Sequence, residues 1–466
     1  MTTLTMPTIR TMPIPVNAGL PLIGTLIPMS KDPLGFVVDS ARRYPELVNI
    51  KIMGGGLIQV THPDVIEQVL VTHSHKFIKD KGLRVFAKPV FGNGLLTSDG
   101  DFWLRQRRMA QPAFHRQRIN AYAETMTEYT QRAITPWKDG QTRDVHADMM
   151  HLTLEVVSKT LFNSDADEHV AEIGACLGTI MERFSSQGLV AMLEQMTGKV
   201  INRDLHRRYD AAVTRLDEIV DGVIAARKSP HPNPLPGSEG EDLLSMFLEA
   251  RDDDGNGMTD QQLRDECKTM FLAGHETTAL SLSWTWWLLS LNPHVKTKLR
   301  EELQRVLNGR VPTMADLQQL TFTEQVIKES MRLMPPAWGI QREAIEDVEV
   351  VGPSGTRYCI AKGSGVLMSQ YATHRDPRWF PDPDEFKPER WTPEFVKGLP
   401  KYAYFPFGGG PRLCIGQQFA FMEAMLMLAT IAQRFDLTLA PNQRIVPQPS
   451  ITMRPKYGMK MIVKEI

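Results

Sequence analysis

The amino-acid sequence predicts a mainly α-helical fold with a minor antiparallel β portion. Two observations support this fold class: apolar residues recur at helical spacing along most of the 466 residues, and strand-like patterns are few and short. The segments with helical spacing are Val65–Thr72, Phe102–Ala110, Val145–Leu161, Leu205–Ala226, Asp260–Leu291, Phe322–Leu333 and Gln417–Phe435. The segments with strand-like patterns are Leu47–Met53, Leu57–Thr61, Val348–Val351 and Met459–Val463.

The longest predicted helix, Asp260–Leu291, has a clear start and end. Thr259 and Gln262 have the spacing of a capping box, and Pro293 lies just beyond the last helical residue. The segment Lys228–Asp242 contains four prolines and predicts a surface loop, because proline disrupts regular structure. Motifs on both sides of this loop depend on each other, so we predict one domain over residues 1–466, with a flexible segment over residues 1–18.

Composition and charge exclude several classes of protein. Lys and Arg number 53 and Asp and Glu number 54, so no charge excess favours a nucleic-acid partner. The four scattered cysteines show no CxxC pairing, which argues against a zinc site and a secreted disulfide scaffold. The longest apolar run, Phe419–Phe435, is interrupted by Glu423 and is shorter than the roughly 18 residues of a membrane span. We therefore expect a cytoplasmic protein without a membrane anchor.

The most informative stretch is Phe407–Gly416, with the sequence FGGGPRLCIG. Three glycines and a proline cannot begin a helix comfortably, yet an apolar helical pattern starts directly after Cys414. Unpaired backbone N–H groups and the helix dipole at such a position stabilise an anionic sulfur. Phe407 is placed to shield that sulfur from water, and Arg412 to pair with an acidic group. By itself, Cys414 is better explained as an ordinary buried thiol, as most lone cysteines are.

The whole ten-residue pattern resembles the haem-binding loop of the cytochrome P450 family, F-x-x-G-x-R-x-C-x-G, at every defined position. The resemblance implies the cytochrome P450 fold, haem b (iron protoporphyrin IX) as the cofactor, and Cys414 as the axial ligand of the iron. A thiolate ligand pushes electron density onto iron and favours O–O cleavage. The implied haem-binding residues of the loop are Phe407, Gly410, Arg412, Cys414 and Gly416.

A second motif, Glu329 with Arg332, has the i,i+3 spacing that puts both side chains on one face of a helix. Taken alone, the pair is explained as well by a solvated ion pair. In the cytochrome P450 family, such a pair forms a buried triad with an arginine of a later loop. The matching residue here is Arg390, in the stretch PDEFKPERW, and the implied role is structural.

The long helix carries the sequence AGHETT at Ala273–Thr278. A mid-helix glycine costs roughly 1 kcal/mol relative to alanine, so Gly274 needs a reason; a surface turn of the helix is the simple alternative. The pattern resembles the family's oxygen-activation motif, which implies a locally widened helix. In that interpretation Thr277 hydrogen-bonds the oxygen being activated, and Glu276 relays protons from solvent.

The resemblance also implies the residues around the cofactor and the substrate. Trp103 and Arg107 (WxxxR), Arg342 and Arg412 are the expected partners of the haem propionates. The implied substrate-contacting segments are mostly apolar and include Phe86 to Leu96, Phe184–Met196 and Pro336–Ile340. The predicted pocket residues are Leu96, Ala273, Ala337 and Ile451, although Leu96 and Ala337 are equally explained as simple core.

These features predict a haem-thiolate monooxygenase that inserts one atom of O2 into a fatty acid, a terpenoid or a steroid-like molecule. The chain ends soon after the last expected strand, so we expect no fused reductase. Electrons then come from a separate ferredoxin- or flavodoxin-type donor with its reductase. A peroxygenase, or a peroxide isomerase or dehydratase, is the alternative, but Glu276 followed by Thr277 favours the O2 route. A haem gas sensor or electron carrier has little use for proton-delivery groups.

Overall fold

The computed structural model describes residues 11–21, 23–52, 55–115, 119–120, 122–162, 167–185, 202–228 and 242–466. Helices dominate these residues and strands form the minor part, so the predicted fold class is confirmed. Within the chain, Met1–Gly82, Trp338–Glu385 and Lys397–Cys414 form one compact unit. Leu83–Ala337, Phe386–Val396 and Ile415–Ile466 form a second one, and each unit is described by itself. The single domain over residues 1–466 stays a prediction.

The first unit is built on a six-stranded sheet with the strand order β2-β3-β4-β10-β7-β5. A smaller sheet has the order β1-β9-β8. The β portion is mixed rather than purely antiparallel, because the pairs β1–β9, β2–β3 and β4–β10 are parallel. The strands are β1 (Thr11–Met12), β2 (Val16–Asn17), β3 (Leu47–Ile52), β4 (Gly55–Val60), β5 (Phe77–Lys79), β7 (Ile340–Ala344), β8 (Val348–Val351), β9 (Arg357–Ile360) and β10 (Gly365–Met368).

Short helices cover this sheet. The apolar face of α2 packs on it through Val37, Val38 and Ala41, which form a buried cluster with Leu367 and Ala372. The helical elements of the unit are α1 (Leu26–Lys31), α2 (Pro33–Arg43), α3 (Pro63–Glu67), η1 (Gln68–Thr72), η2 (Ser74–Lys76), α17 (Gln370–Thr373) and η6 (Gly410–Arg412). Two further helices, α4 (Lys81–Phe86) and α18 (Pro393–Gly398), cross the sequence boundaries of the units.

One prediction about the first unit needs correction. The segment Val65–Thr72 is not one regular helix: α3 ends at Glu67, and residues Gln68–Thr72 continue as a π-helical turn. The flexibility expected over residues 1–18 stays a prediction, although β1 and β2 within this segment pair with β9 and β3. Prolines between and beside these strands favour extended backbone, which suits edge strands. Residues 1–10 lie outside the described part of the chain.

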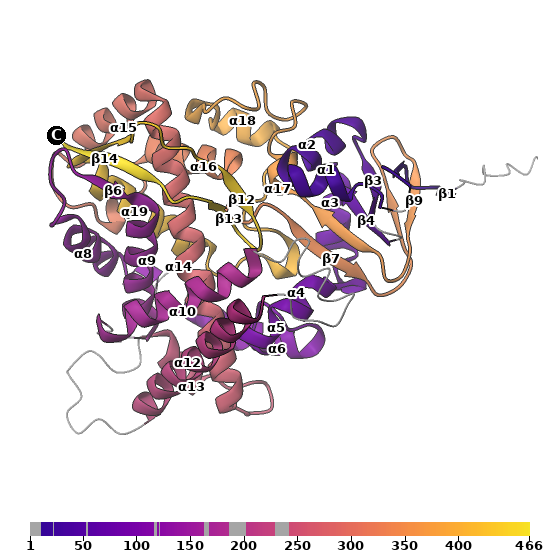
Figure 1. The fold of residues 1–466 in the computed structure, drawn as a ribbon, viewed down its shortest axis with the longest axis horizontal. Helices are drawn as coiled ribbons and strands as arrows, with labels where there is room; N and C mark the ends of the chain where they lie inside the picture. The colour runs from indigo at the N-terminus through magenta and orange to yellow at the C-terminus, as the bar shows by residue number, and fades with distance from the viewer. Residues whose placement is uncertain are drawn as a thin grey trace, which may run out of the picture. The chain divides into compact units, whose positions relative to one another are not determined.

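The second unit is helical around α14, which packs against α9, α12, α16 and α19 (Figure 1). Its main helices are α5 (Lys88–Phe91), α6 (Gly100–Ala110), α8 (Ala123–Ile134), α9 (Val145–Phe162), α10 (Asp167–Ser185), α12 (Arg203–Lys228), α13 (Leu243–Glu249), α14 (Asp260–Leu291), α15 (Pro293–Val306), α16 (Thr321–Leu333) and α19 (Gln417–Ala432). Its 3₁₀ turns are η3 (Gln111–Phe114), η4 (Met314–Asp316) and η5 (Pro388–Arg390).

The bounds of α14 are those predicted from the sequence, and the capping box explains its start. The Thr259 hydroxyl accepts a hydrogen bond from the Gln262 N–H at 3.3 Å, and the Gln262 side chain accepts one from the Thr259 N–H at 2.8 Å. By contrast, α19 ends at Ala432, because Phe435 already begins β11, so the predicted helix to Phe435 is too long.

Two small antiparallel sheets complete the second unit. One has the order β11-β14-β6, and the other is the hairpin of β12 and β13, which carries residues of the site described below. The strands are β6 (Thr142–Asp144), β11 (Phe435–Leu439), β12 (Pro447–Pro449), β13 (Met453–Pro455) and β14 (Lys460–Glu465). The predicted loop Lys228–Asp242 lies outside the described residues between its two ends.

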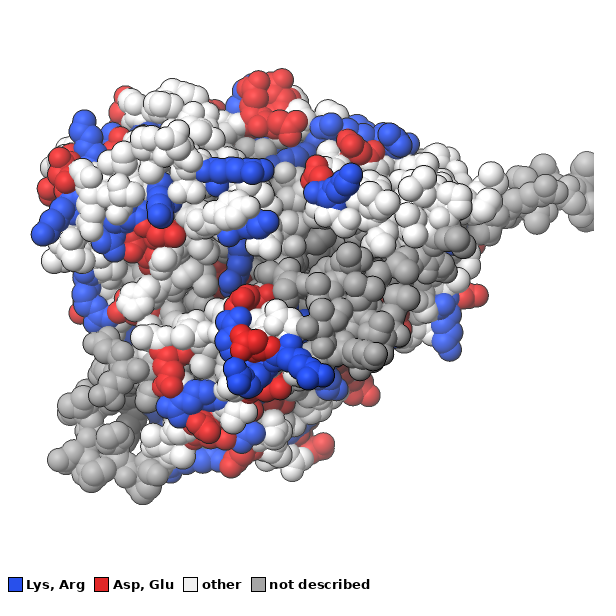
Figure 2. All heavy atoms as spheres, viewed as in Figure 1, with Lys and Arg blue, Asp and Glu red and all other residues white. Residues whose placement is uncertain are grey.

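The surface carries both signs of charge, as the near balance of 53 basic and 54 acidic residues requires. On the face shown in Figure 2, Lys and Arg side chains alternate with Asp and Glu, and neither sign gathers into a continuous field. Among the described residues, no helix has both the length and the apolar character that crossing a membrane requires.

Candidate active site

The loop that ends at Cys414 is held in shape by its own backbone. The Cys414 N–H donates to the Phe407 carbonyl at 3.0 Å, and the Leu413 N–H donates to the Gly410 carbonyl at 3.1 Å. The turn η6 lies between these bonds, and Gly416 is the N-cap of α19. Cys414 is exposed, so the thiol stands at the surface of its own unit, just before a helix N-terminus.

Glycine at position 410 is required by close packing of this loop. The residue has φ of +66°, and a Cβ there would lie 1.9 Å from the carbonyl oxygen of Leu70 in η1. A side chain at this position therefore collides with backbone that cannot move freely. The loop conformation thus depends on the π-helical turn η1 as well as on its own sequence.

The middle of α14 has an accessible stripe in an otherwise buried helix. Ala273, Gly274 and Thr277 are partly or fully accessible, whereas the residues on either side of them are buried. The Thr277 hydroxyl donates to the Ala273 carbonyl at 2.8 Å. The backbone is α-helical from Asp260 to Leu291, so the local widening that the resemblance implies is not seen.

Glu276 lies beside this stripe, but its carboxylate is fully buried. Its Oε1 accepts a hydrogen bond from Arg454 Nε at 2.6 Å and another from the Thr452 hydroxyl. Burial by itself raises the pKa of Glu276, but the charge of Arg454 and these two hydrogen bonds outweigh burial, so the pKa is lowered. Glu276 is therefore an ionised side chain turned toward β13, and this conformation gives it no contact with solvent.

Two histidines next to this ion pair are neutral near pH 7. Burial, followed by the charge of Arg454, lowers the pKa of His146 to about 4. Burial likewise lowers the pKa of His275, whose Nδ1 lies 2.7 Å from the Phe271 carbonyl oxygen. Neither ring therefore supplies a second positive charge to Glu276 at neutral pH.

Glu329, Arg332 and Arg390 lie together in the second unit, on α16 and η5. The Glu329 and Arg332 side chains are fully buried, with Nε–Oε2 at 2.8 Å and Nη2–Oε1 at 2.9 Å. Arg390 Nε donates to Glu329 Oε1 at 2.9 Å. The Lys387 N–H and the Trp391 indole N–H each donate to the same carboxylate at 2.9 Å. The carboxylate thus accepts five hydrogen bonds, three of which tie α16 to the loop around η5.

Comparison with known proteins identifies the family. The family model for Cytochrome P450 matches residues 13–462. The chain belongs to the cytochrome P450 family. It is 38% identical over 440 residues to "Cyclooctatin synthase" of Streptomyces melanosporofaciens, covering 93% of this chain and 92% of that protein. It is 35% identical over 430 residues to "Cyclooctat-9-en-7-ol 5-monooxygenase" of the same organism, covering 91% and 89%.

A solved structure, the heme domain of cytochrome P450DA, is similar along the whole chain. The TM-score is 0.85 at 30% sequence identity, and the match covers 98% of each chain. This P450 is therefore an oxidoreductase of the haem-thiolate monooxygenase type, with haem as its cofactor. O2, an apolar substrate and a separate redox partner belong to the reaction of this family.

Each unit of this P450 has features that fit a haem. In the first unit, a packed glycine loop delivers an exposed Cys414 rather than burying the thiol. In the second unit, Ala273, Gly274 and Thr277 leave a small-residue surface on a buried helix, where a flat group meets no large side chain. A thiol and a small-residue helix face are the kinds of surface that a thiolate-bound porphyrin needs.

The four expected propionate partners come from both units. Trp103 is buried and Arg107 half-buried on α6 of the second unit. Arg342 lies on β7 and Arg412 on η6 of the first unit, and both are half-buried. Partial burial of these arginines restricts their motion.

The predicted substrate residues are also partly accessible. Leu96, Ala337 and Ile451 are half-buried, and Ala273 is exposed. The loop that carries Leu96 is fastened to α14, because the Asn93 N–H donates to Asp265 at 2.8 Å and the Leu95 N–H to Glu266 at 3.0 Å. Most of the expected segment Phe184–Met196 lies outside the described residues.

Several residues of the site were missed by sequence reasoning. The acids Asp265 and Glu266 in an apolar helix are a signal that was available, because buried charges need partners. The same signal exists for Glu423, the single acid in the apolar run of α19. For Arg454 the local sequence carries no signal, because its partner Glu276 lies 178 residues away.

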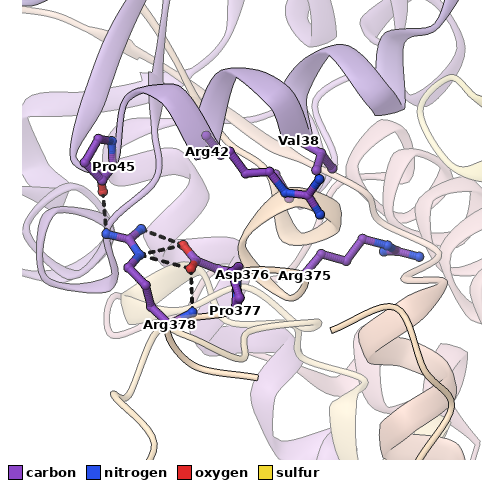
Figure 3. A pocket seen from close by; sticks show the side chains of 9 residues that line it. Val38, Arg42, Pro45, Arg375, Asp376, Pro377 and Arg378 are labelled. Atoms are coloured by element: carbon purple, nitrogen blue, oxygen red, sulfur yellow. Dashed lines mark hydrogen bonds and ion pairs between the residues drawn. The ribbon is translucent and has the colours of Figure 1, made fainter. Parts of the chain in front are cut away.

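A cavity of about 300 Å³ in the first unit is lined by none of the predicted site residues (Figure 3). Arg378 at its edge bonds Asp376 Oδ2 at 2.5 Å and the Pro45 carbonyl at 3.1 Å. Arg375 lies 3.7 Å above the Tyr371 ring. Arg378 thus fastens the turn after α17 to the chain that follows α2, and we assign the cavity no part in the reaction.

Proposed function

We propose that this P450 hydroxylates a compact terpenoid, with Cys414 as the thiolate ligand of the haem. Thr277 and Glu276 are the groups that deliver protons. The observation that carries the proposal is the combination on α14 of an accessible hydroxyl, Thr277, with an adjacent buried acid, Glu276. Oxygen activation consumes protons, and a hydroxyl beside a carboxyl can pass a proton to oxygen over a short distance.

The loop supports the assignment of Cys414. Its sulfur stands at an exposed position close to the N-terminus of α19, where backbone N–H groups and the helix dipole favour a thiolate. When bound, a thiolate-ligated haem supplies O2 activation, because the thiolate pushes electron density onto iron and favours O–O cleavage. Phe407 shields one side of the sulfur, and Gly410 and Gly416 keep the backbone close to a flat ligand.

The roles of the remaining residues follow from their chemistry. Trp103, Arg107, Arg342 and Arg412 provide N–H donors, three of them cationic, for two haem propionates. Glu329, Arg332 and Arg390 act structurally by tying α16 to η5. Leu96, Ala273, Ala337 and Ile451 offer an apolar surface to the substrate, which burial rather than charge then holds.

The relatives support a terpenoid over a fatty acid. Two of them are named for cyclooctatin and for cyclooctat-9-en-7-ol, which belong to the terpenoid class. The four proposed pocket residues are apolar, and a fatty-acid carboxylate would need Lys88 or Arg84 as its anchor. We further propose a ferredoxin- or flavodoxin-type electron donor with its reductase, and a cytoplasmic location. The absence of disulfides among the four cysteines favours a reducing compartment.

The thiolate assignment is tested by the carbon monoxide spectrum of the reduced protein. Cys414→Ser should abolish the thiolate-type band, whereas Cys359→Ser, which changes another exposed cysteine, should keep it. A thiolate-type band in Cys414→Ser would exclude Cys414 as the ligand.

The substrate class is tested by titrating the ferric protein and following the haem spin state. Cyclooctat-9-en-7-ol should give a saturable shift from low to high spin, and fatty acids of graded length should give none. A shift that grows with chain length would instead assign an elongated channel and a fatty-acid substrate.

A further inference from the structure

The hairpin of β12 and β13 contacts α14 at the buried acid. Arg454 Nε and the Thr452 hydroxyl both bond the same oxygen, Glu276 Oε1. The other oxygen, Oε2, is buried and has no hydrogen-bond partner among the described residues. Arg454 itself is 18% exposed, so one end of the ion pair reaches solvent while Glu276 does not. Through Arg454, the hairpin therefore connects this buried carboxylate to the surface.

Met453 fastens the hairpin to its surroundings, and the turn just before Met453 carries the proposed substrate contact Ile451. The Met453 N–H donates to the Pro336 carbonyl at 2.9 Å, and the Met453 carbonyl accepts from the Trp284 indole at 2.9 Å. Thr452, which bonds Glu276, directly follows Ile451 in this turn. Ala337, the other proposed contact, directly follows Pro336. If this turn moves, the hydrogen bonds that Thr452 and Arg454 make to Glu276 are therefore the first contacts to change.

The charge of Glu276 depends on Arg454. The groups that face this carboxylate are Arg454 on β13, His275 on α14 and His146 at the start of α9, with Asp144 of β6 beside His146. Both histidines are neutral near pH 7, so Arg454 is the group that balances the carboxylate charge against burial.

Helix α19, which packs against α14, contains a buried acid that can be compared with Glu276. Glu423 on α19 is fully buried and has no basic partner among the described residues, and burial raises its pKa to about 8. An acid in such surroundings takes up a proton at neutral pH. We expect the same of Glu276 whenever Arg454 moves away.

We propose that the β12–β13 hairpin is a latch on Glu276. While Arg454 and Thr452 hold the carboxylate, it stays ionised. When the hairpin separates from α14, Glu276 takes up one proton from solvent. It then donates this proton to the Thr277 hydroxyl oxygen, which gives its own proton to the oxygen being reduced, so that the Glu276 carboxylate and the ion pair are restored. Arg454 is thus a positioning residue. The proposal rests on the proposed function, because it assumes that Glu276 is the proton donor.

The charge of Glu276 is tested by infrared spectroscopy of the ferric holoprotein at neutral pH without added ligand. Arg454→Met should gain one protonated carboxyl C=O band that the double variant Arg454→Met/Glu276→Gln lacks. The neutral Glu423 provides a reference band, which Glu423→Gln removes. Arg454→Lys should keep the wild-type spectrum, as should Arg434→Met, which changes an exposed arginine outside the site. An Arg454→Met spectrum without the new band overturns the latch.

The proton transfer is tested by oxidation of the chemically reduced holoprotein in air, in H2O and D2O. Wild-type oxidation should show a solvent isotope effect and slow with rising pH. In Arg454→Met, oxidation should be severalfold faster with a flatter pH profile, because the proton is already bound. If Glu276→Gln slows oxidation but Arg454→Met behaves as wild type, the latch is wrong. If Glu276→Gln has no effect, the role of Glu276 in the proposed function fails instead.

Discussion

Glu329 on α16 and Glu423 on α19 are both completely buried, yet their surroundings are opposite. Glu329 accepts hydrogen bonds from two arginines, a backbone N–H and an indole N–H. Neither oxygen of Glu423 has a hydrogen-bond partner of normal geometry among the described residues. Burial raises the pKa of Glu423 to about 8, and the Thr278 hydroxyl only opposes this rise. Burial alone therefore does not decide the charge of an acid; its donors do.

Because of this difference, the two buried acids have different roles in the molecule. Five N–H groups hold the Glu329 carboxylate as a fixed tie between α16 and η5. Glu423 carries a proton near pH 7 and contributes no ion pair to the fold. Glu276 lies between these two cases, because it has one basic partner that stands on a separate hairpin.

The largest effect is expected from breaking the Glu329 tie. Arg332→Met leaves a buried carboxylate without its bidentate partner, so the free energy of unfolding should fall by about 3–5 kcal/mol. Denaturant unfolding of the holoprotein measures this loss. The double variant Arg332→Met/Glu329→Gln should recover part of it, because the uncompensated charge is gone. A loss below about 1 kcal/mol would contradict the view that this pair is a structural tie.

The second effect concerns the pH dependence of stability. The pKa of Glu423 is raised from 4.5 to about 8 in the folded protein, so the folded state binds more protons than the unfolded state in this window. Its contribution to stability is complete below pH 4.5 and is lost as the pH rises toward 8, by about 1.4 kcal/mol per pH unit. Glu423→Gln should flatten this slope in thermal or denaturant unfolding measured across the window.

Glu276 supplies the contrast for that experiment. Its pKa is lowered, so its contribution is present above its unfolded value of 4.5 and is lost as the pH falls through the folded value. Glu276→Gln should therefore change only the acid limb of the stability curve. Equal slopes in wild type and Glu423→Gln between neutral and mildly acidic pH would show that Glu423 is ionised after all.

The smallest effect is expected on the outer face of α16. Glu324 and Lys328 form an i,i+4 pair at 2.6 Å, with side chains 39% and 30% exposed. Lys328→Ala should lower the free energy of unfolding by only about 0.3–0.5 kcal/mol, because water screens the pair. The loss should shrink in high salt. If Lys328→Ala lowered the free energy of unfolding as much as Arg332→Met does, the distance between the charged groups, rather than their burial, would set the strength of these ion pairs.

The features predicted correctly are those that depend on residues close together in the sequence. The start and end of α14 follow from Thr259, Gln262 and Pro293, which act within one turn of the helix ends. The strand β8 and the helix start at Val145 follow equally from local patterns. The parallel strand pairs and the pairing of residues 11–17 could not be predicted, because they depend on partners more than 30 residues away.

By itself, the sequence determined the family, the thiolate loop and the order of the motifs, because glycine, cysteine and arginine spacing acts over short stretches of chain. It also placed three glutamates, Glu276, Glu329 and Glu423, in helices. Only the tertiary structure decided the partners of Glu329 and the charges of Glu276 and Glu423. Desolvation raises the pKa of a buried carboxyl in the same way at every site, and the outcome depends on which donors the fold brings to it. For Glu276 that donor, Arg454, arrives from a strand 178 residues later.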